Sequence, residues 1–268
     1  MDVIIVIFKL LGSLGMFLYG MRVMSDGVQK VAGEKLQNIL NYMTTNRVVA
    51  VITGFVITGI IQSSSATTVM VISFVNASLL NLTQAIGVIM GANIGTTVTT
   101  WIVSFFGFKF NITSIALPII GIGFPLFFSK KQNRKDFGEI LVGFGLLFMG
   151  LAFLKNSVPD INGEALAFLQ HYSDKGFLTF VIFVIVGTLL TIVLESSSAA
   201  MAITVTMAYK GYIGFEPAAA IVLGENIGTT VKAFLVSIGT NVNARRAARA
   251  HFLFNILGVV WMAFIFKY

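Results

Sequence analysis

Apolar stretches of roughly the length that crosses a bilayer recur along this chain of 268 residues. More than half of the residues are hydrophobic, 25 are phenylalanine and only 11% are charged. These features together are typical of an all-α polytopic membrane protein. The first apolar stretch, residues 3–24, has neither the basic start nor the cleavage site of a signal peptide, so we interpret it as a mature transmembrane helix.

The net charge of +7 does not indicate nucleic-acid binding. The basic residues fall in short loops between apolar stretches, where charge bias usually records membrane orientation. The absence of cysteine excludes disulfides, thiolate metal sites and cysteine catalysis. The sequence also lacks a Walker loop, a dinucleotide fingerprint and an HExxH motif. We therefore expect no enzyme activity, no organic cofactor and no nucleic-acid partner.

The chain matches itself at an offset of 133 residues. At this offset the serines of residues 63–65 coincide with those of residues 196–198, and "GANIGTT" (residues 91–97) coincides with "GENIGTT" (residues 224–230). The first helix finds its own match at an offset of 130, where "LGMFLYGM" aligns with "FGLLFMGL". We predict two repeats, residues 1–128 and 137–268, joined by a basic linker at 129–136 and forming one transport domain.

The basic residues predict that the two repeats are inverted. Four of them lie in the linker, which places it in the cytoplasm, and residues 155–176 have no basic excess, as suits the outer face. With each serine tract in a hairpin that enters and returns, "NARRAARAH" also reaches the cytoplasm. The same path puts further basic residues of the first repeat inside: Arg22, Lys30, Lys35 and Arg47. In the alternative, each serine tract lies in a full membrane crossing, and the basic residues are then divided less clearly between the two sides of the membrane.

Three consecutive serines are unusual in a membrane helix. A single serine there is most often a packing residue that hydrogen-bonds to a carbonyl one turn earlier. Ser63, Ser64 and Ser65 point in three directions at about 100° per residue, so a regular helix cannot turn all of them toward one neighbour. An interrupted helix resolves this, because hydroxyls and freed amides then converge on a ligand. We predict that each tract is the tip of a broken or re-entrant hairpin.

The "GANIGTT" and "GENIGTT" segments offer amide and hydroxyl groups within about one helical turn. Their glycines permit a tight or unwound backbone that would complete a binding site. Close helix packing through small residues is an equally good reading of the same pattern.

The paired QSSS-type tracts, each followed after about 30 residues by G-x-N-I-G-T, resemble the type II sodium-phosphate cotransporter family. The resemblance covers nearly the whole chain, including "ARAHFLFNILG" before the last stretch. It implies a phosphate site near mid-membrane between the repeats, with sodium held nearby. The phosphate contacts it implies are Gln62, Ser63, Ser64, Ser65, Ser196, Ser197, Ser198, Asn93 and Asn226.

Sodium prefers oxygen ligands, as hard cations do. We therefore expect the nearby hydroxyl and carboxylate oxygens to hold it: Thr67, Thr68, Thr96, Thr97, Glu195, Glu225, Thr229 and Thr230. Some longer relatives in that family carry a cytoplasmic helical domain that this sequence does not contain, which would make it a minimal or truncated member.

Glu195 and Glu225 depart from this pattern, since repeat one has Gln62 and Ala92 at their positions. A carboxylate in a membrane segment is functional by default, because its burial is unfavourable. Beside a divalent anion, Glu195 must be protonated or offset by a cation, which makes proton coupling an alternative to sodium. Lys232 is expected to pair with Glu225 or to contact the anion, although it would also suit a membrane interface.

The segment "VQKVAGEKLQNIL", residues 28–40, is amphipathic. We expect it to lie along the membrane surface, and it would equally suit bracing a homodimer. We interpret the chain as a sodium-coupled phosphate transporter with alternating access, and as a multi-pass protein of the cell inner (plasma) membrane. The alternatives are a proton-coupled transporter, a transporter of sulfate or a carboxylate, and an anion channel. A serine hydrolase would need a base near Ser64 or Ser197, and neither histidine lies in an apolar stretch to serve.

Overall fold

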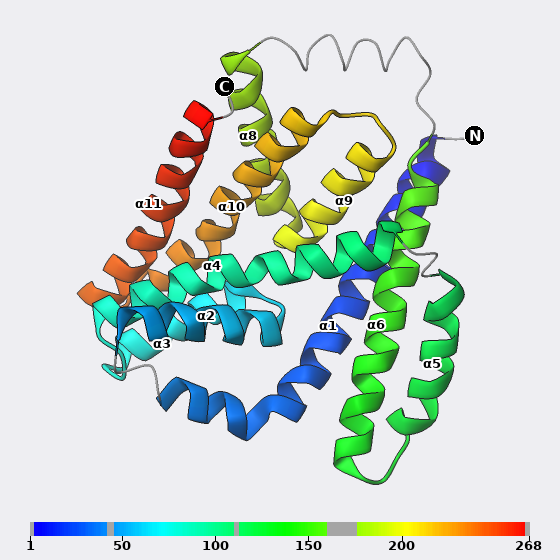
Figure 1. Cartoon of the computed structure of the whole chain (residues 1–268), viewed down its shortest axis with the longest axis horizontal. Helices are drawn as coiled ribbons and strands as arrows, with labels where there is room; N and C mark the ends of the chain where they lie inside the picture. The colour runs from blue at the N-terminus through cyan, green and yellow to red at the C-terminus, as the bar shows by residue number, and fades with distance from the viewer. Residues whose placement is uncertain (1–2, 42–45, 110–112, 160–175, 266–268) are drawn as a thin grey trace. The chain divides into compact units, whose positions relative to one another are not determined.

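The computed structural model describes residues 3–41, 46–109, 113–159 and 176–265, and the regular structure in these ranges is helical (Figure 1). The helices are α1 (Val3–Asn41), α2 (Arg47–Ile61), α3 (Ser64–Asn76), α4 (Leu82–Ser104) with a short π-helix (Phe105–Lys109), α5 (Thr113–Phe127), α6 (Gln132–Ser157), α8 (Phe177–Leu194), α9 (Ser197–Tyr209), α10 (Phe215–Ser237) and α11 (Val242–Ile265). Within the described ranges, α1, α4, α6, α8, α10 and α11 are long and apolar enough to cross a membrane.

The described chain forms two compact units that interleave the two halves of the sequence. Unit 1 comprises Met1–Tyr42, Gly59–Gln62 and Thr97–Asp160, and unit 2 comprises Met43–Thr58, Ser63–Thr96 and Ile161–Tyr268. Each unit therefore takes helices from both expected repeats. The units do not coincide with the division at residues 129–136, and α4 contributes residues to both.

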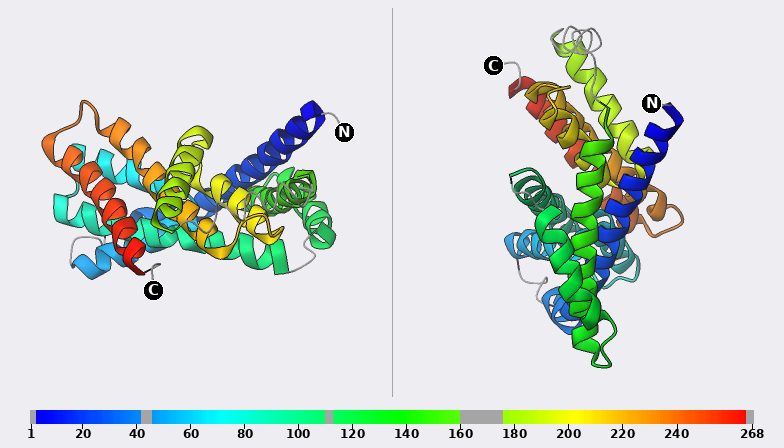
Figure 2. Two further views of the ribbon diagram at one scale, coloured as in Figure 1. Left: turned by 90° about the horizontal axis from the view of Figure 1, so that it is seen from above. Right: turned by 90° about the vertical axis from the view of Figure 1, so that its right-hand side faces the viewer.

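In unit 1, α1 and α6 lie side by side (Figure 2). They touch through glycines: a Cβ atom at Gly20 would lie 2.2 Å from the Leu147 nitrogen, and one at Gly150 would lie 2.3 Å from the Phe17 nitrogen. The contacting residue numbers rise along α1 while they fall along α6, which shows that the two helices are antiparallel. At the offset of 130, Phe17 corresponds to Leu147 and Gly20 to Gly150, so the two helices exchange equivalent contacts.

In unit 2, α4 packs on α2 in the same way that α10 packs on α8. A Cβ at Gly91 would lie 1.9 Å from the Val51 oxygen, and one at Gly224 would lie 2.0 Å from the Val184 oxygen, the equivalent atom at an offset of 133. Of the two interpretations of "GANIGTT" and "GENIGTT", the structure favours close helix packing over an unwound backbone, since both segments are regular helix. Their glycines allow two helix backbones to approach closely.

Two boundaries differ from expectation. The basic linker is shorter than residues 129–136, because α6 already begins at Gln132. The amphipathic segment at residues 28–40 is not a separate surface helix but continues the first span as part of α1. Within it, Lys30 forms an ion pair with Glu139 of α6, and the two charged atoms lie 2.5 Å apart.

Polar side chains set several helix starts. Asn81 and Gln84 bond reciprocally at the start of α4: the Asn81 side chain accepts from the Gln84 amide and the Gln84 side chain accepts from the Asn81 amide. This is a capping box, which satisfies two amides that have no partner within the helix. Asn241 caps α11 by accepting from the Ala244 amide at 2.9 Å.

Candidate functional site: a pocket shared by the two serine tracts

Both serine tracts interrupt a helix, and they do so in the same way. α2 ends before Gln62 and α8 ends before Glu195, and both of these residues have positive φ, 57° and 52°. This left-handed conformation is uncommon for residues other than glycine and stops the preceding helix. The next residue, Ser63 or Ser196, is extended and begins a new helix.

The first serine of each tract is therefore a helix cap. Ser63 Oγ accepts from the Ala66 amide and Ser196 Oγ accepts from the Ala199 amide, each at 3.2 Å. Capping by serine leaves other first-turn amides of α3 and α9 without a partner in the helix. The physical reason for the break is thus the pairing of a left-handed residue with a capping serine, repeated at an offset of 133 residues.

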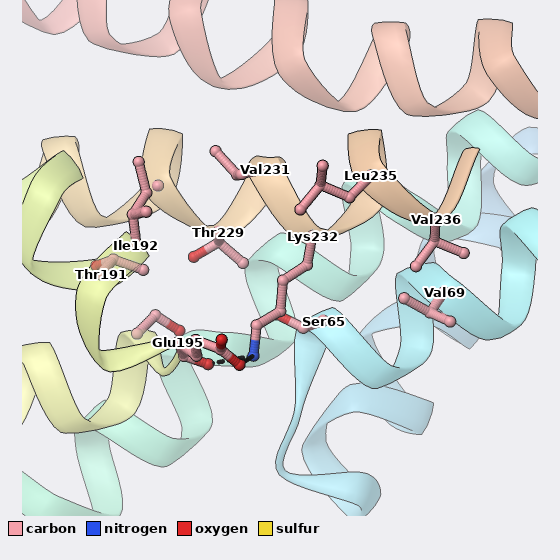
Figure 3. Close-up of a pocket in the computed structure, with 12 residues that line it drawn as sticks. Ser65, Val69, Thr191, Ile192, Glu195, Thr229, Val231, Lys232, Leu235 and Val236 are labelled. Atoms are coloured by element: carbon pink, nitrogen blue, oxygen red, sulfur yellow. Dashed lines mark hydrogen bonds and ion pairs between the residues drawn. The ribbon is translucent and has the colours of Figure 1, made fainter. Parts of the chain in front are cut away.

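One pocket of unit 2, about 450 Å³ in volume, receives a residue from each tract (Figure 3). Ser65 comes from the first turn of α3, and Ser197 comes from the first turn of α9. α8 and α10 supply the remaining walls. The lining residues are Ser65, Val69, Thr191, Ile192, Glu195, Ser197, Gly228, Thr229, Val231, Lys232, Leu235 and Val236. The structure thus brings together two tracts that are far apart in the sequence.

The charged residues of the pocket, Glu195 and Lys232, are paired with each other (Figure 3). Lys232 Nζ donates a hydrogen bond to the backbone oxygen of Glu195 and lies 3.5 Å from its Oε2. The expected pairing of Lys232 with Glu225 is not what the structure contains. Lys232 supplies the positive charge that offsets Glu195 in the pocket.

Thr191 lines the pocket with a hydroxyl that has no hydrogen-bond partner among the described residues, although its side chain is only 3% exposed. Its counterpart in the first half, Thr58, donates to Thr67 Oγ1 at 3.0 Å. In the second half Ala200 stands where Thr67 would be, which removes the partner. A buried polar group without a partner is unfavourable unless something else satisfies it.

The other expected phosphate contacts lie outside the pocket lining. Ser64 is buried, with 5% of its surface exposed, and Ser198 is half-buried. Asn226 is exposed on α10. Gln62 belongs to unit 1, where its Nε2 donates to the Gly59 oxygen and its Oε1 accepts from Thr99 at 2.8 Å.

Asn93 has a partner that the sequence did not reveal. Its Oδ1 lies 3.1 Å from Nε2 of His251 on α11, and His251 is 1% exposed. The expectation that neither histidine lies in an apolar stretch is therefore wrong for His251, which is buried in the apolar helix α11. The signal that would have found this buried pair is the position of His251 in an apolar helix after the arginine cluster.

Glu225 lies in the middle of α10 and is 1% exposed. Its Oε1 accepts from Thr204 of α9 at 2.7 Å, and its Oε2 has no hydrogen-bond partner among the described residues. Sequence reasoning selected Glu225 but missed Thr204, whose counterpart in the first half is Val71. The carboxylate and the hydroxyl therefore form a polar pair that exists only in the second half.

Most of the threonines expected to ligate sodium bond to their own helices. Thr67, Thr96, Thr229 and Thr230 each donate to a backbone oxygen three or four residues earlier. Thr68 is fully buried, and its hydroxyl has no partner in the described chain. Thr97 belongs to unit 1 and is exposed. Thr229 both bonds to its own helix and lines the pocket, as Thr191 also does.

The long apolar helices of the described ranges define a multi-pass membrane protein. The model of the Na+/Pi-cotransporter family matches residues 16–156 and 163–267, and the chain belongs to this family. It is thus a member of a phosphate transporter family and not of an enzyme family.

The relatives include bacterial and animal proteins. The chain is 33% identical over 246 residues to the uncharacterized protein YqeW of Bacillus subtilis, covering 91% of the chain and 77% of YqeW. It is 30% identical over 253 residues to YjbB of Salmonella typhimurium, provisionally named an inorganic phosphate export protein, covering 93% of the chain but only 45% of YjbB. It is 38% identical over 99 residues to sodium-dependent phosphate transport protein 2A of Rattus norvegicus, covering 35% of the chain and 15% of that protein. No solved structure matches the chain.

Proposed function

We propose that this protein is a secondary transporter of inorganic phosphate in the plasma (inner) membrane, and that phosphate binds in the pocket between the serine tracts. The observation that supports this most is that Ser65 and Ser197 line one pocket, although they come from different halves of the chain. Serine hydroxyls and first-turn amides are donors, and an oxyanion accepts hydrogen bonds from both.

The helix starts make the pocket suitable for an anion. α3 and α9 both begin at the tracts, and the N-terminus of a helix carries a partial positive charge. The unpartnered hydroxyl of Thr191 supplies a further donor from α8. Donors of this kind favour oxyanions as a class, so sulfate is the competitor that the assay must include.

Sodium is the coupling ion in this proposal. The family and the name of the rat relative support it. The acidic, buried pair of Glu225 and Thr204 offers a carboxylate oxygen and a hydroxyl, which suit a small hard cation. The same carboxylate would suit a proton, so a proton-coupled transporter is the second candidate. The unpartnered Oε2 of Glu225 is the observation in favour of either.

Alternating access requires two halves that face opposite sides of the membrane in turn. Inverted repeats, residues 1–128 and 137–268, supply such halves. The exchange of equivalent contacts between antiparallel α1 and α6 supports this part of the proposal, because equivalent helices of inverted repeats cross the membrane in opposite directions. The breaks at Gln62 and Glu195 support re-entrant hairpins built from α2 with α3 and from α8 with α9.

The test is radiolabelled phosphate flux in proteoliposomes. We expect uptake that depends on an imposed sodium gradient, persists when a proton ionophore is present and resists a large excess of sulfate. If flux followed a pH gradient in the absence of sodium, the coupling ion would be the proton and not sodium. Flux of sulfate in place of phosphate would refute the assignment of phosphate as the substrate. Passive flux of many anions at high rates would indicate a channel.

A further inference from the structure

The two halves of the chain use different chemistry at equivalent positions beside the helix breaks. At the offset of 133 residues, Gln62 corresponds to Glu195 and Thr99 corresponds to Lys232. In unit 1, Thr99 donates to the Gln62 side chain at 2.8 Å. In unit 2, Lys232 donates to the Glu195 backbone and stands 3.5 Å from its carboxylate. A neutral pair has thus been exchanged as a unit for an ionic pair.

The geometry of the ionic pair leaves Lys232 able to bind something else. A charge-assisted hydrogen bond between an ammonium and a carboxylate is usually about 2.7–2.9 Å long, so the 3.5 Å separation is a loose contact. An ammonium has three donors, and the backbone oxygen of Glu195 accepts from one of them. The Lys232 side chain is 38% exposed and the Glu195 side chain is 77% exposed, so neither is sealed away from the pocket.

The position of Lys232 is equally specific. It projects from α10 into the pocket that Ser65 and Ser197 line, and Figure 3 shows its Nζ at the Glu195 end of that pocket. Thr229 lies on the same helix three residues earlier and lines the same pocket. The ammonium therefore lies beside Glu195 in a pocket that hydroxyl donors also line.

We propose that Lys232 is a direct ligand of the transported oxyanion, and that the Glu195 carboxylate competes with the oxyanion for this ammonium. The proposal rests on the proposed function, because it needs a phosphate in the pocket. It assigns the positive charge of the site to a side chain that replaces the threonine of the first half. Glu195 then serves as an internal anion whose loose contact with Lys232 a phosphate would replace.

A simpler role for Lys232 would be to neutralise Glu195, and a double-mutant cycle separates the two roles. The variants are Lys232→Thr and Glu195→Gln, which copy the first half, together with the double variant. Equilibrium binding of radiolabelled phosphate to the purified protein is the readout, and size-exclusion chromatography checks folding. Lys131→Thr, an exposed lysine outside the pocket, is the matched control.

If Lys232 is a ligand, Lys232→Thr lowers phosphate affinity roughly tenfold to a hundredfold, and the double variant is just as weak. Glu195→Gln alone keeps or raises the affinity, because a competing carboxylate has gone. If Lys232 only neutralises Glu195, the double variant recovers the affinity of the wild type, and this recovery would overturn the proposal. The Lys131→Thr control binds as the wild type does.

Two further results keep the test decisive. If Lys232→Thr does not fold, Lys232→Gln and Lys232→Arg take its place, and a ligand role requires that only the arginine variant retain affinity within a few fold. Failure of the wild type to bind phosphate, while it binds sulfate in the same assay, would refute phosphate as the substrate. The same cycle repeated with sulfate would then decide the role of Lys232 separately.

Discussion

Thr204 of α9 donates a hydrogen bond to the Glu225 carboxylate of α10 across 2.7 Å, in a place where Glu225 is 1% exposed. A buried carboxylate is unfavourable unless it is protonated or paired with a cation. The neighbouring threonine satisfies only one of its oxygens. The unpartnered oxygen is therefore a place where a proton or a cation would stabilise the Glu225 side chain.

Replacing Glu225 by alanine tests this requirement. Ala92 occupies the equivalent position in the first half, so the packing of α10 should tolerate the change. We expect the apparent affinity for sodium to fall about tenfold or more, because a charged ligand is lost, while phosphate binding at saturating sodium persists. Initial uptake rates at several sodium concentrations provide the measurement. Glu216→Ala, at the exposed start of α10, is the control, and an unchanged sodium profile in Glu225→Ala would exclude this residue from coupling.

Ser65→Ala and Ser197→Ala each remove a hydroxyl that lines the pocket. The loss of one hydrogen bond to a charged ligand is worth about 1.5–3 kcal/mol, which corresponds to roughly a tenfold to a hundredfold loss of phosphate affinity. A direct phosphate-binding assay on the purified variants measures this loss of affinity. Ser73→Ala is matched in chemistry, since the Ser73 hydroxyl donates to the Val69 oxygen of its own helix and the residue is exposed, and this variant should bind phosphate normally. Wild-type affinity in both pocket variants would rule out the serine tracts as the anion site.

Gly91→Ala and Gly224→Ala introduce a methyl group where two helix backbones touch. The added Cβ would lie 1.9 Å from the Val51 oxygen or 2.0 Å from the Val184 oxygen, so the helices must separate. Overpacking of this kind usually destabilises by about 1–3 kcal/mol and sometimes by more. We expect lower melting temperatures for both variants in thermal aggregation assays. Gly258→Ala meets nothing within 4 Å and should be neutral or slightly stabilising, and equal melting temperatures for all three would contradict the packing.

Membrane orientation is accessible to labelling, because the natural chain contains no cysteine. Asn133 lies at the start of α6, Asn156 lies near its end, and Asn243 lies in the first turn of α11. Single cysteines at these exposed positions should label from the cytoplasm at 133 and 243 and from the outside at 156. Labelling of positions 133 and 243 from opposite sides would exclude the inverted arrangement.

The helical class, the membrane setting and the two broken tracts could all be read from the sequence, because apolar length and consecutive serines are local signals. The partners across helices could not. Nothing near Lys232 in the sequence indicates Glu195, since the two are brought together by the break after α8 and the packing of α10 on α8. The expected pairing with Glu225 used proximity in sequence, and Glu225 faces α9 instead.

The "GANIGTT" and "GENIGTT" segments show a second limit of prediction from the sequence. Their pattern of glycine, asparagine and threonine suits both a binding loop and a close helix contact, and only the partner helix distinguishes them. Gly91 and Gly224 meet backbone oxygens of Val51 and Val184, so packing accounts for them. The loop at residues 155–176, on which the charge argument partly depended, lies mostly outside the described residues.

Between α1 and α6, the approach of Gly20 to Leu147 and that of Gly150 to Phe17 are one contact made twice, with the partners interchanged. Two identical molecules related by a two-fold axis make contacts of this isologous kind. A polypeptide half as long, with one such helix, would present a surface that fits its own antiparallel copy. The single chain therefore holds two helices that contact each other as the copies of a homodimer do, while its two halves differ in carrying a neutral pair and an ionic pair.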